Sequence, residues 1–276
     1  MNGIDVSAWQ GKIDWEKLKG KIDFAILKMG NIFQTQENNL DKYFERNYSE
    51  CKRLGIPIGV YVYNYAKTTD RVLKGAEFII NNLKGKSLEL PVYIDMEDEK
   101  IASLGKKRLT EICVEFNTQI EKAGFWAGVY ANRNWYDNFL DKNEIKRRYT
   151  TWIAHYRVKQ DKYKGEYDML QFSSSGRLDG INGKVDVNIM YRDLISDIEK
   201  SKNKKETIRP SKFYPACNPK FTSIVDALKS IKVNSSFLNR KRLAYQNGIP
   251  HYNGTYEQNV ILLNLLKKGK LRNGWL

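Results

Sequence analysis

Short apolar runs alternate with helix-like segments throughout residues 1–200, and this alternation constrains the fold most strongly. Runs rich in β-branched and aromatic residues predict eight strands, at residues 4–8, 24–28, 58–63, 92–95, 127–131, 151–154, 168–172 and 185–187. Segments with a helical apolar period lie between them, at 14–18, 41–54, 69–83, 106–123, 132–140 and 190–199. This order is typical of a parallel sheet with crossover helices. Because several connections are too short for a full helix, we expect an irregular, helix-poor α/β barrel of the TIM-like (β/α) type, with an open doubly wound sheet as the alternative.

The positive charge is concentrated at the end of the chain. Residues 201–276 contain 15 of the 47 Lys and Arg residues but only 3 of the 32 Asp and Glu residues. The polar stretch 201–212, which contains Pro210, predicts a linker. Three capped segments, at 223–231, 236–247 and 255–268, predict a small all-helical domain. We therefore expect a barrel domain at 1–200, a linker at 201–212 and a cationic helical module at 213–276.

The last predicted helix has a run of apolar residues. We expect it to pack Ile261, Leu262, Leu265 and Leu266 inward. The cationic module that contains it attracts an anionic polymer, and nucleic acid, acidic lipid or an anionic cell-wall glycan would each satisfy the physics. A solvated helical face without a partner is the other interpretation.

The sequence favours neither a membrane protein nor a cofactor-dependent one. No apolar run approaches the roughly 18 residues of a membrane helix, and the N-terminus has no basic region followed by an apolar stretch. We therefore expect that the protein is made in the cytoplasm and does not insert into a membrane. Cys51, Cys113 and Cys217 lack metal-ligand spacing, which predicts reduced thiols and no metal site. No glycine-rich phosphate loop follows a strand, so we expect no nucleotide cofactor.

Acidic residues follow several of the predicted strands. Asp95 and Glu97 are two residues apart at the end of a buried run, so their side chains point the same way. Two neighbouring carboxyl groups cannot both ionise easily, and one acid beside one anion is the working pair of a glycosidase. A solvated loop start and a metal site remain alternatives. Asp5 and Asp186 also follow apolar runs, at the kind of position where barrel active sites are assembled.

Aromatic residues are frequent near the same strand ends. These are Trp9, Tyr61, Tyr63, Tyr65, Tyr93, Tyr130, Trp152 and Tyr156. Such rings stack on sugars or simply fill the core of a barrel. We expect His155, at the end of a predicted strand, to line a pocket rather than to act as a catalytic base. No Gly-x-Ser-x-Gly motif occurs, which excludes serine-hydrolase chemistry.

Several motifs occur in an order that resembles a known family. They are Gly3-Ile4-Asp5-Val6-Ser7-x-Trp9-Gln10-Gly11, Asp23-Phe24-Ala25-Ile26-Leu27-Lys28, Gly59-Val60-Tyr61-Val62-Tyr63, Pro91-Val92-Tyr93-Ile94-Asp95-Met96-Glu97, Trp152-Ile153-Ala154-His155-Tyr156, Gln171-Phe172-Ser173-Ser174-Ser175-Gly176 and Gly180-Ile181-x-Gly183-x-Val185-Asp186-x-Asn188. In this order they resemble the glycoside hydrolase family 25 lysozymes, the Chalaropsis-type N-acetylmuramidases. The resemblance covers residues 1–195.

The resemblance implies a role for each of the four acids. Glu97 is the general acid that protonates the glycosidic oxygen and later acts as base on water. Asp95 is either the nucleophile or the anion that assists attack by the substrate's own N-acetyl group. Asp5 and Asp186 belong to the acid cluster that raises the pKa of Glu97 and holds the sugar.

The resemblance and the aromatic pattern together predict the substrate contacts. They are Tyr61, Tyr63, Trp9, Tyr93, Tyr130, Trp152, His155 and Gln171. The family often has Trp where this chain has Leu170 and His where it has Val62, and we expect both departures on the wall of the groove.

The C-terminal part, Tyr214 to Leu271, resembles a cell-wall-binding module of phage endolysins from Gram-positive hosts. The whole chain is thus expected to be an endolysin that cleaves the β-1,4 bond between N-acetylmuramic acid and N-acetylglucosamine of peptidoglycan with net retention. It would be made in the host cytoplasm and reach the wall after holin-type release, with an anionic wall polymer as partner and no nucleic acid. The sequence leaves open self-association of the module and a tail-only product that starts at Met190. A bacterial autolysin and a catalytically silent wall-binding protein are the alternatives.

Overall fold

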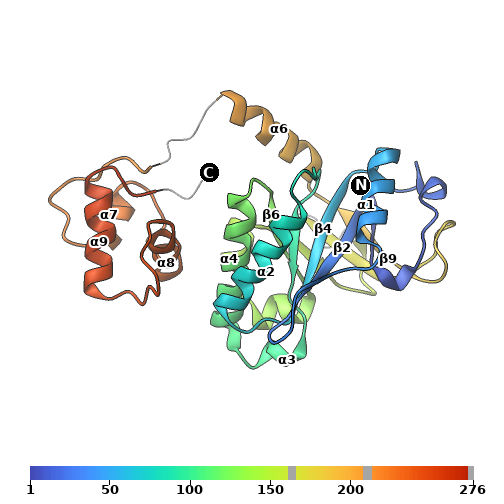
Figure 1. The fold of residues 1–276 in the computed structure, drawn as a ribbon, viewed down its shortest axis with the longest axis horizontal. Coiled ribbons are helices and arrows are strands. Elements are labelled where there is room, and N and C mark those ends of the chain that lie inside the picture. Colours follow the sequence, from blue (N-terminus) through green and yellow to red (C-terminus); the bar gives the residue numbers. More distant parts are fainter. Residues whose placement is uncertain (161–165, 208–212, 273–276) are drawn as a thin grey trace. The chain divides into compact units, whose positions relative to one another are not determined.

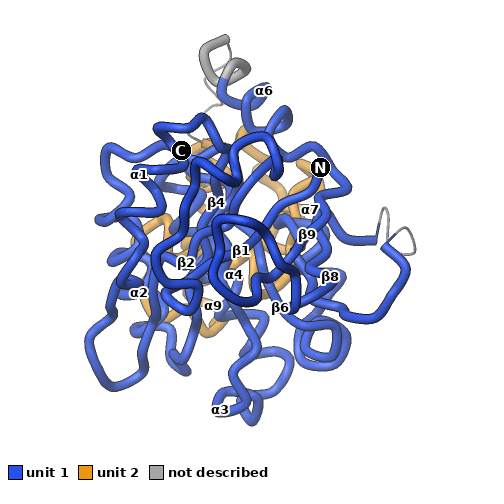
Figure 2. Tube along the Cα trace, turned by 90° about the vertical axis from the view of Figure 1, so that its right-hand side faces the viewer, with its two compact units in different colours: residues 1–203 blue, residues 204–276 orange. Residues whose placement is uncertain are grey.

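The computed structural model describes residues 1–160, 166–207 and 213–272. Figure 2 shows the chain divided into two compact units, residues 1–203 and 204–276. Each unit has a hydrophobic core of its own, so each is described by itself.

The first unit is built around a closed barrel (Figure 1). Its strands are β1 (Asn2–Val6), β2 (Phe24–Ile32), β4 (Ile58–Asn64), β5 (Val92–Asp95), β6 (Ala127–Asn132), β7 (Thr150–Ala154), β8 (Met169–Gly176) and β9 (Val185–Met190). They are hydrogen-bonded in the order β1-β9-β8-β7-β6-β5-β4-β2, and pairing of β1 with β2 closes the ring. The two-residue strand β3 (Asn39–Leu40) pairs only with β2, outside the ring. The expected barrel is confirmed, and the open sheet is excluded.

One strand of the barrel runs against the others. β9 is antiparallel to both β8 and β1, whereas the remaining pairs in the ring are parallel. The connection from β8 to β9 spans only residues 177–184. A parallel crossover needs a dozen residues or more, so this short loop reverses the chain instead. The expectation of a uniformly parallel sheet is wrong for this strand.

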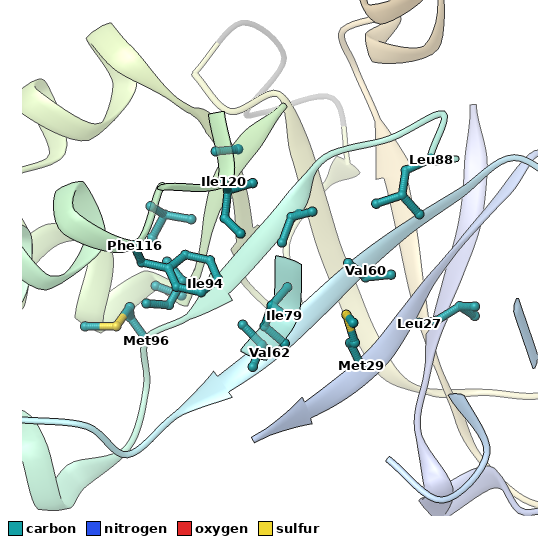
Figure 3. Close-up of a cluster of buried hydrophobic side chains, with 14 of the residues drawn as sticks. Leu27, Met29, Val60, Val62, Ile79, Leu88, Ile94, Met96, Phe116 and Ile120 are labelled. Atoms are coloured by element: carbon teal, nitrogen blue, oxygen red, sulfur yellow. The ribbon is translucent and has the colours of Figure 1, made fainter. Parts of the chain in front are cut away.

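Side chains along the strands alternate between two cores. Phe24, Tyr93, Trp152 and Met169 point into the barrel and form the inner core. Their strand neighbours point outward and contribute to the larger outer core. Figure 3 shows part of that outer core, including strand residues Val62 and Ile94 and helix residues Ile79 and Phe116. Because successive strand residues face opposite sides, polar residues in register with the inner core also face the barrel interior.

Helices cover the outside of the barrel. They are α1 (Phe44–Leu54), α2 (Thr69–Asn82), α3 (Glu99–Ala102), α4 (Gly105–Lys122), α5 (Lys142–Arg148) and α6 (Leu194–Thr207), with short 3-10 turns η1 (Ala8–Gln10) and η2 (Trp15–Leu18) and a π-helical turn η3 (Trp135–Phe139). The sequence did not predict α3 and α5, which are short. The helix expected at 190–199 begins at Leu194, because β9 extends to Met190.

Helix α6 extends through the start of the expected linker. Trp126 donates an indole hydrogen bond to Ser201 Oγ (3.1 Å), and Lys202 Nζ donates to the carbonyl of Leu88 (3.1 Å). These bonds hold α6 against the barrel. Residues 208–212 of the expected linker lie outside the described residues.

The second unit contains three helices among its described residues, as expected. They are α7 (Ile224–Ser230), α8 (Phe237–Gln246) and α9 (Tyr256–Lys267). Ser223, Ser236 and Thr255 cap their N-termini. In α9 the buried residues are Leu262, Leu263 and Leu266, whereas Ile261 is exposed. The expected inward position of Ile261 is therefore wrong. No helix in the described part of the chain is long and apolar enough to cross a membrane.

Candidate active site

Alternation along the strands brings the predicted acids to one end of the barrel. Asp5 faces inward near the end of β1, and Asp95 ends β5. Asp186 is the second residue of β9, where it pairs in register with Asp5. Since β9 is antiparallel, its beginning lies at the edge where the parallel strands end. The reversed strand thus places Asp186 beside acids that come from strand ends.

Asp5 is almost fully buried, at 4% exposure, and is held by two amides. Its Oδ2 accepts hydrogen bonds from Gln171 Nε2 and from Asn188 Nδ2, both at 2.8 Å. The Oδ1 atom of Asn188 in turn accepts a bond from the Trp152 indole at 2.8 Å. The amide of Asn188 therefore has a fixed orientation, with its NH₂ group directed at the carboxyl of Asp5.

Two tyrosines fix the other amide in the same way. Tyr130 and Tyr156 each donate a hydroxyl hydrogen bond to Gln171 Oε1, at 3.1 and 2.7 Å. Trp152 packs against the ring of Tyr130 at 4.4 Å between centroids. The acid cluster thus rests on a layer of hydrogen-bonded amides and aromatic rings.

All four carboxyl groups have raised pKa values. Burial, and next the charge of Asp186, raises the pKa of Asp5 to about 8 in spite of its two amide hydrogen bonds. Burial raises the pKa of Asp186 to about 6. Burial and the charge of Glu97 raise the pKa of Asp95, which is 2% exposed and whose Oδ1 has no hydrogen-bond partner in the described structure. Burial also raises the pKa of Glu97, against a hydrogen bond from Asn132.

A cation lies beside this cluster. Lys28 follows Ile26 on the inner face of β2, and its Nζ lies 5.4 Å from the centre of the Tyr63 ring. Its charge lowers the pKa of both Asp95 and Glu97, although by less than burial raises them. Lys28, Asn132 and Asn188 are site residues that our sequence analysis did not single out. Their inward register on β2, β6 and β9 was the available signal.

The predicted aromatic contacts differ in how deeply they are buried in the barrel. Tyr61 is partly buried, and the charges of Asp5 and Asp95 help to raise its pKa. Tyr63 is likewise partly buried, and its hydroxyl donates a hydrogen bond to Asp98 Oδ2 (3.4 Å). Tyr93 and Trp152 are buried in the inner core, where they support the acids from below.

The remaining predicted contacts lie in connections after the strands. His155 follows the end of β7, and its backbone N–H donates to the Gln171 carbonyl. Trp9 lies in η1, directly after β1, and is 91% exposed. It is not part of the buried cluster.

The two departures from the family pattern do not lie where we expected them. Val62 and Leu170 both belong to the outer core, between the barrel and its helices. Each precedes or follows an inward-facing residue on its strand, so its own side chain faces outward. Placing them on the groove wall was therefore wrong, and they leave the acid cluster unaffected.

No cluster of three or more His, Cys, Asp or Glu side chains suited to a metal ion occurs within residues 1–160, 166–207 and 213–272. The arrangement offers instead protonated and ionised carboxyl groups side by side. That combination can transfer a proton to a leaving oxygen and stabilise a developing positive charge.

Comparisons with known proteins identify similar chains. An autolytic lysozyme of Clostridium acetobutylicum is 27% identical over 191 residues, which cover 68% of this chain and 55% of the relative. The modular autolysin LytC of Streptococcus pneumoniae is 27% identical with a TM-score of 0.61, and the match covers 69% of this chain and 46% of LytC. LytC has also been solved in complex with a synthetic peptidoglycan ligand. The CTP1L endolysin is 25% identical with a TM-score of 0.62, over 72% of this chain and 69% of that one.

The matches to the autolytic lysozyme and to LytC thus span only about half of each relative's length. The model of the family "Glycosyl hydrolases family 25" matches residues 4–181, which include the whole acid cluster except Asp186. This chain belongs to glycosyl hydrolase family 25, the lysozyme-type family that its motifs predicted.

Proposed function

We propose that the protein is a lysozyme that hydrolyses the β-1,4 bond between N-acetylmuramic acid and N-acetylglucosamine in peptidoglycan. The observation that carries this proposal is the convergence of Asp5, Asp95, Glu97 and Asp186 at one end of the barrel, where burial raises the pKa of every one. The names of the relatives, an autolytic lysozyme and an autolysin solved with a peptidoglycan ligand, support the same substrate.

Glu97 is the general acid in this proposal. It follows the end of β5 and is less buried than Asp95, so its carboxyl can reach a bound glycan. Its raised pKa keeps it protonated at a pH where a free glutamate is ionised, which a proton donor requires. After the leaving group departs, the resulting carboxylate accepts a proton from water.

Asp95 stabilises the positive charge that develops on the sugar. Lys28 favours its ionised form, and protonation of Glu97 removes the neighbouring charge that opposes ionisation. In its ionised form Asp95 either attacks the sugar or orients the substrate's N-acetyl group for attack. Both routes give net retention, which NMR detection of the first anomer released would test; an inverted first product would contradict it.

Replacement of the proton donor tests the proposal. Glu97→Gln keeps the size of the side chain but removes the proton, so we expect at least ~100-fold slower release of reducing ends from purified peptidoglycan, with an unchanged melting temperature. Glu77→Gln, on the exposed surface of α2, is the matched control and should keep the wild-type rate. A Glu97→Gln protein that cleaves as fast as the control would refute the role of Glu97.

The second unit supplies attachment to the wall in this account. Residues 204–276, which form this unit, carry 14 basic and 3 acidic residues, which suits an anionic wall polymer. Binding through charge is weakened by salt. Pull-down with purified walls over a series of salt concentrations tests this, and salt-independent binding would contradict it.

We further infer that the protein acts as a phage endolysin, reaching the wall after holin-type release. The name of the CTP1L endolysin, which is 25% identical over 72% of this chain, supports this proposal. A bacterial autolysin of the same activity is the second candidate, supported by the names of the other relatives. A holin gene beside the coding sequence would favour the endolysin. Cell-wall synthesis genes beside it, without a holin gene, would favour the autolysin.

A further inference from the structure

A rigid turn after β1 holds Trp9 in solvent. Ser7 caps η1, since its Oγ accepts the Trp9 N–H (3.2 Å), and the backbone N–H of Ser7 donates to Gln10 Oε1 (2.9 Å). Gly11 ends the turn with a φ of 64°, a conformation that favours glycine. The backbone on both sides of Trp9 is therefore fixed by local hydrogen bonds.

Two other loops clamp the same turn. Asp41 Oδ2 accepts the backbone N–H of Ala8 at 2.9 Å, and Asp41 Oδ1 accepts that of Tyr43 at the same distance. On the other side, Gln10 Nε2 donates to the carbonyl of Lys184 at 3.3 Å. Lys184 directly precedes β9 and lies two residues before Asp186. The turn is thus fastened between the loop after β3 and the loop that leads to the acid cluster.

The exposure of Trp9 is unusual for this chain. It is 91% exposed, whereas Trp15, Trp135 and Trp152 are buried. A large apolar ring in water forgoes the free energy that burial would provide. The hydrogen bonds of the turn nevertheless hold the ring in this exposed position.

Trp9 also lies close to the acids. It follows Asp5 by four residues, so their Cα atoms are at most about 14 Å apart. The charge of Asp41 helps to raise the pKa of Tyr61, together with the charges of Asp5, Asp95 and Asp186. Tyr61 therefore lies near both Asp41 and the acids, and the bond from Gln10 to Lys184 places the turn at the same end of the barrel as Asp186.

We propose that Trp9 is a stacking platform for a sugar ring of the glycan strand, and that Asp41 is a positioning residue that fixes this platform beside the acid cluster. The choice of a glycan rests on the proposed function. A single exposed ring is too small for an apolar protein or membrane contact, which uses larger patches. It matches the size of one sugar face, and the indole N–H remains available to a sugar hydroxyl.

The platform contributes to binding rather than to bond cleavage. With peptide-free glycan strands as substrate, we expect Trp9→Ala to raise KM about tenfold, the scale of one lost stacking contact, while kcat stays within about twofold. Trp9→Phe keeps a ring and should recover most of the affinity. Asp41→Ala should raise KM in the same direction with kcat maintained, since it frees the turn without removing the ring.

Asp23→Ala is the matched control for the positioning role. Asp23 Oδ2 accepts the backbone N–H of Asn2 at 2.6 Å, so it anchors the opposite end of β1. Its KM should equal that of the wild type. An unchanged KM in Trp9→Ala overturns the platform, and equal KM values for Asp41→Ala and Asp23→Ala overturn the positioning role.

A binding readout separates this proposal from the proposed function. In the Glu97→Gln protein, peptide-free glycan strands should protect tryptophan fluorescence from acrylamide quenching. The protection should be absent when Trp9 is also replaced by Phe. Protection by a glycan that the wild type does not cleave would support the Trp9 platform and refute the lysozyme activity. Cleavage by the wild type without protection of the Glu97→Gln protein would support the lysozyme activity and refute the platform.

Discussion

At the scale of single residues, Asp5 has surroundings that oppose its ionisation. It is buried beside Asp186, with which it pairs in register, and its hydrogen bonds from Gln171 and Asn188 offset this effect only in part. A pKa of about 8 means that Asp5 holds a proton at neutral pH. The protein thus keeps a neutral carboxyl next to Asp186, whose pKa of about 6 leaves it mostly ionised there.

This arrangement makes folding stability depend on pH. Between about pH 4 and pH 8, folded Asp5 binds a proton that the unfolded chain has lost. The free energy of unfolding therefore decreases as pH rises through this window. Asp5→Asn removes the titration, so we expect the variant to be more stable than the wild type at pH 8, by about 1–3 kcal/mol, and the difference to shrink toward pH 4.

Denaturant unfolding at several pH values measures the effect. The exposed control Glu77→Gln should follow the wild-type curve. Curves for Asp5→Asn and wild type that stay parallel from pH 4 to pH 8 would contradict the raised pKa. The same variant should lose activity, because a stabilising change at an active site commonly reduces function.

At the scale of elements, the interior of the barrel depends on small residues opposite large ones. Gly128 on β6 is in register with Tyr93 on β5. A Cβ atom at Gly128 would lie 2.4 Å from Tyr93 Cε1 and 2.4 Å from Thr150 Oγ1. The glycine therefore provides the space in which the Tyr93 ring packs beneath the acids.

Gly128→Ala should overfill this interior. We expect the free energy of unfolding to fall by about 1–3 kcal/mol, as for other overpacked cores, with lower activity because the supporting layer shifts. Chemical denaturation measures the change. Tyr93→Leu makes room for the added methyl group, so the double variant should lose less than the sum of the single losses; strict additivity would contradict the contact.

The elements also show how far the sequence predicts this fold. The alternation of apolar runs placed all eight barrel strands, since burial on both faces leaves a strong apolar signal. It missed the two-residue β3 and the direction of β9, which the length of one loop determines. The four acids could be found from their positions at strand ends and from the family motifs. Lys28 and Asn188 stand in the same motifs, but their places beside the acids were not predicted, because the register of neighbouring strands is known only once the ring closes.

At the scale of the whole molecule, the two units have separate cores, and α6 belongs structurally to the barrel up to at least Lys202. Leu194 is buried in the inner core, and Ser201 and Lys202 make hydrogen bonds to Trp126 and Leu88. Whether a truncated chain keeps a stable barrel therefore depends on whether it keeps α6.

A chain ending at Thr207 keeps these contacts. We expect its melting temperature for the barrel and its rate on soluble glycan to match the full chain, while salt-sensitive wall binding is lost. A chain ending at Asp193 exposes the inner core around Leu194 and should unfold at a lower temperature. If the chain ending at Thr207 failed to cleave soluble glycan, the account of two independent units would be wrong.

The most direct test of the central claim identifies the new reducing end. Purified Gram-positive peptidoglycan is digested with wild type or with Glu97→Gln, reduced with borohydride and analysed by mass spectrometry. We predict reduced muramic acid in the wild-type digest and almost none with Glu97→Gln. Reduced glucosamine would contradict the bond assignment, and no new reducing ends in either digest would contradict the claim that this acid cluster cleaves peptidoglycan.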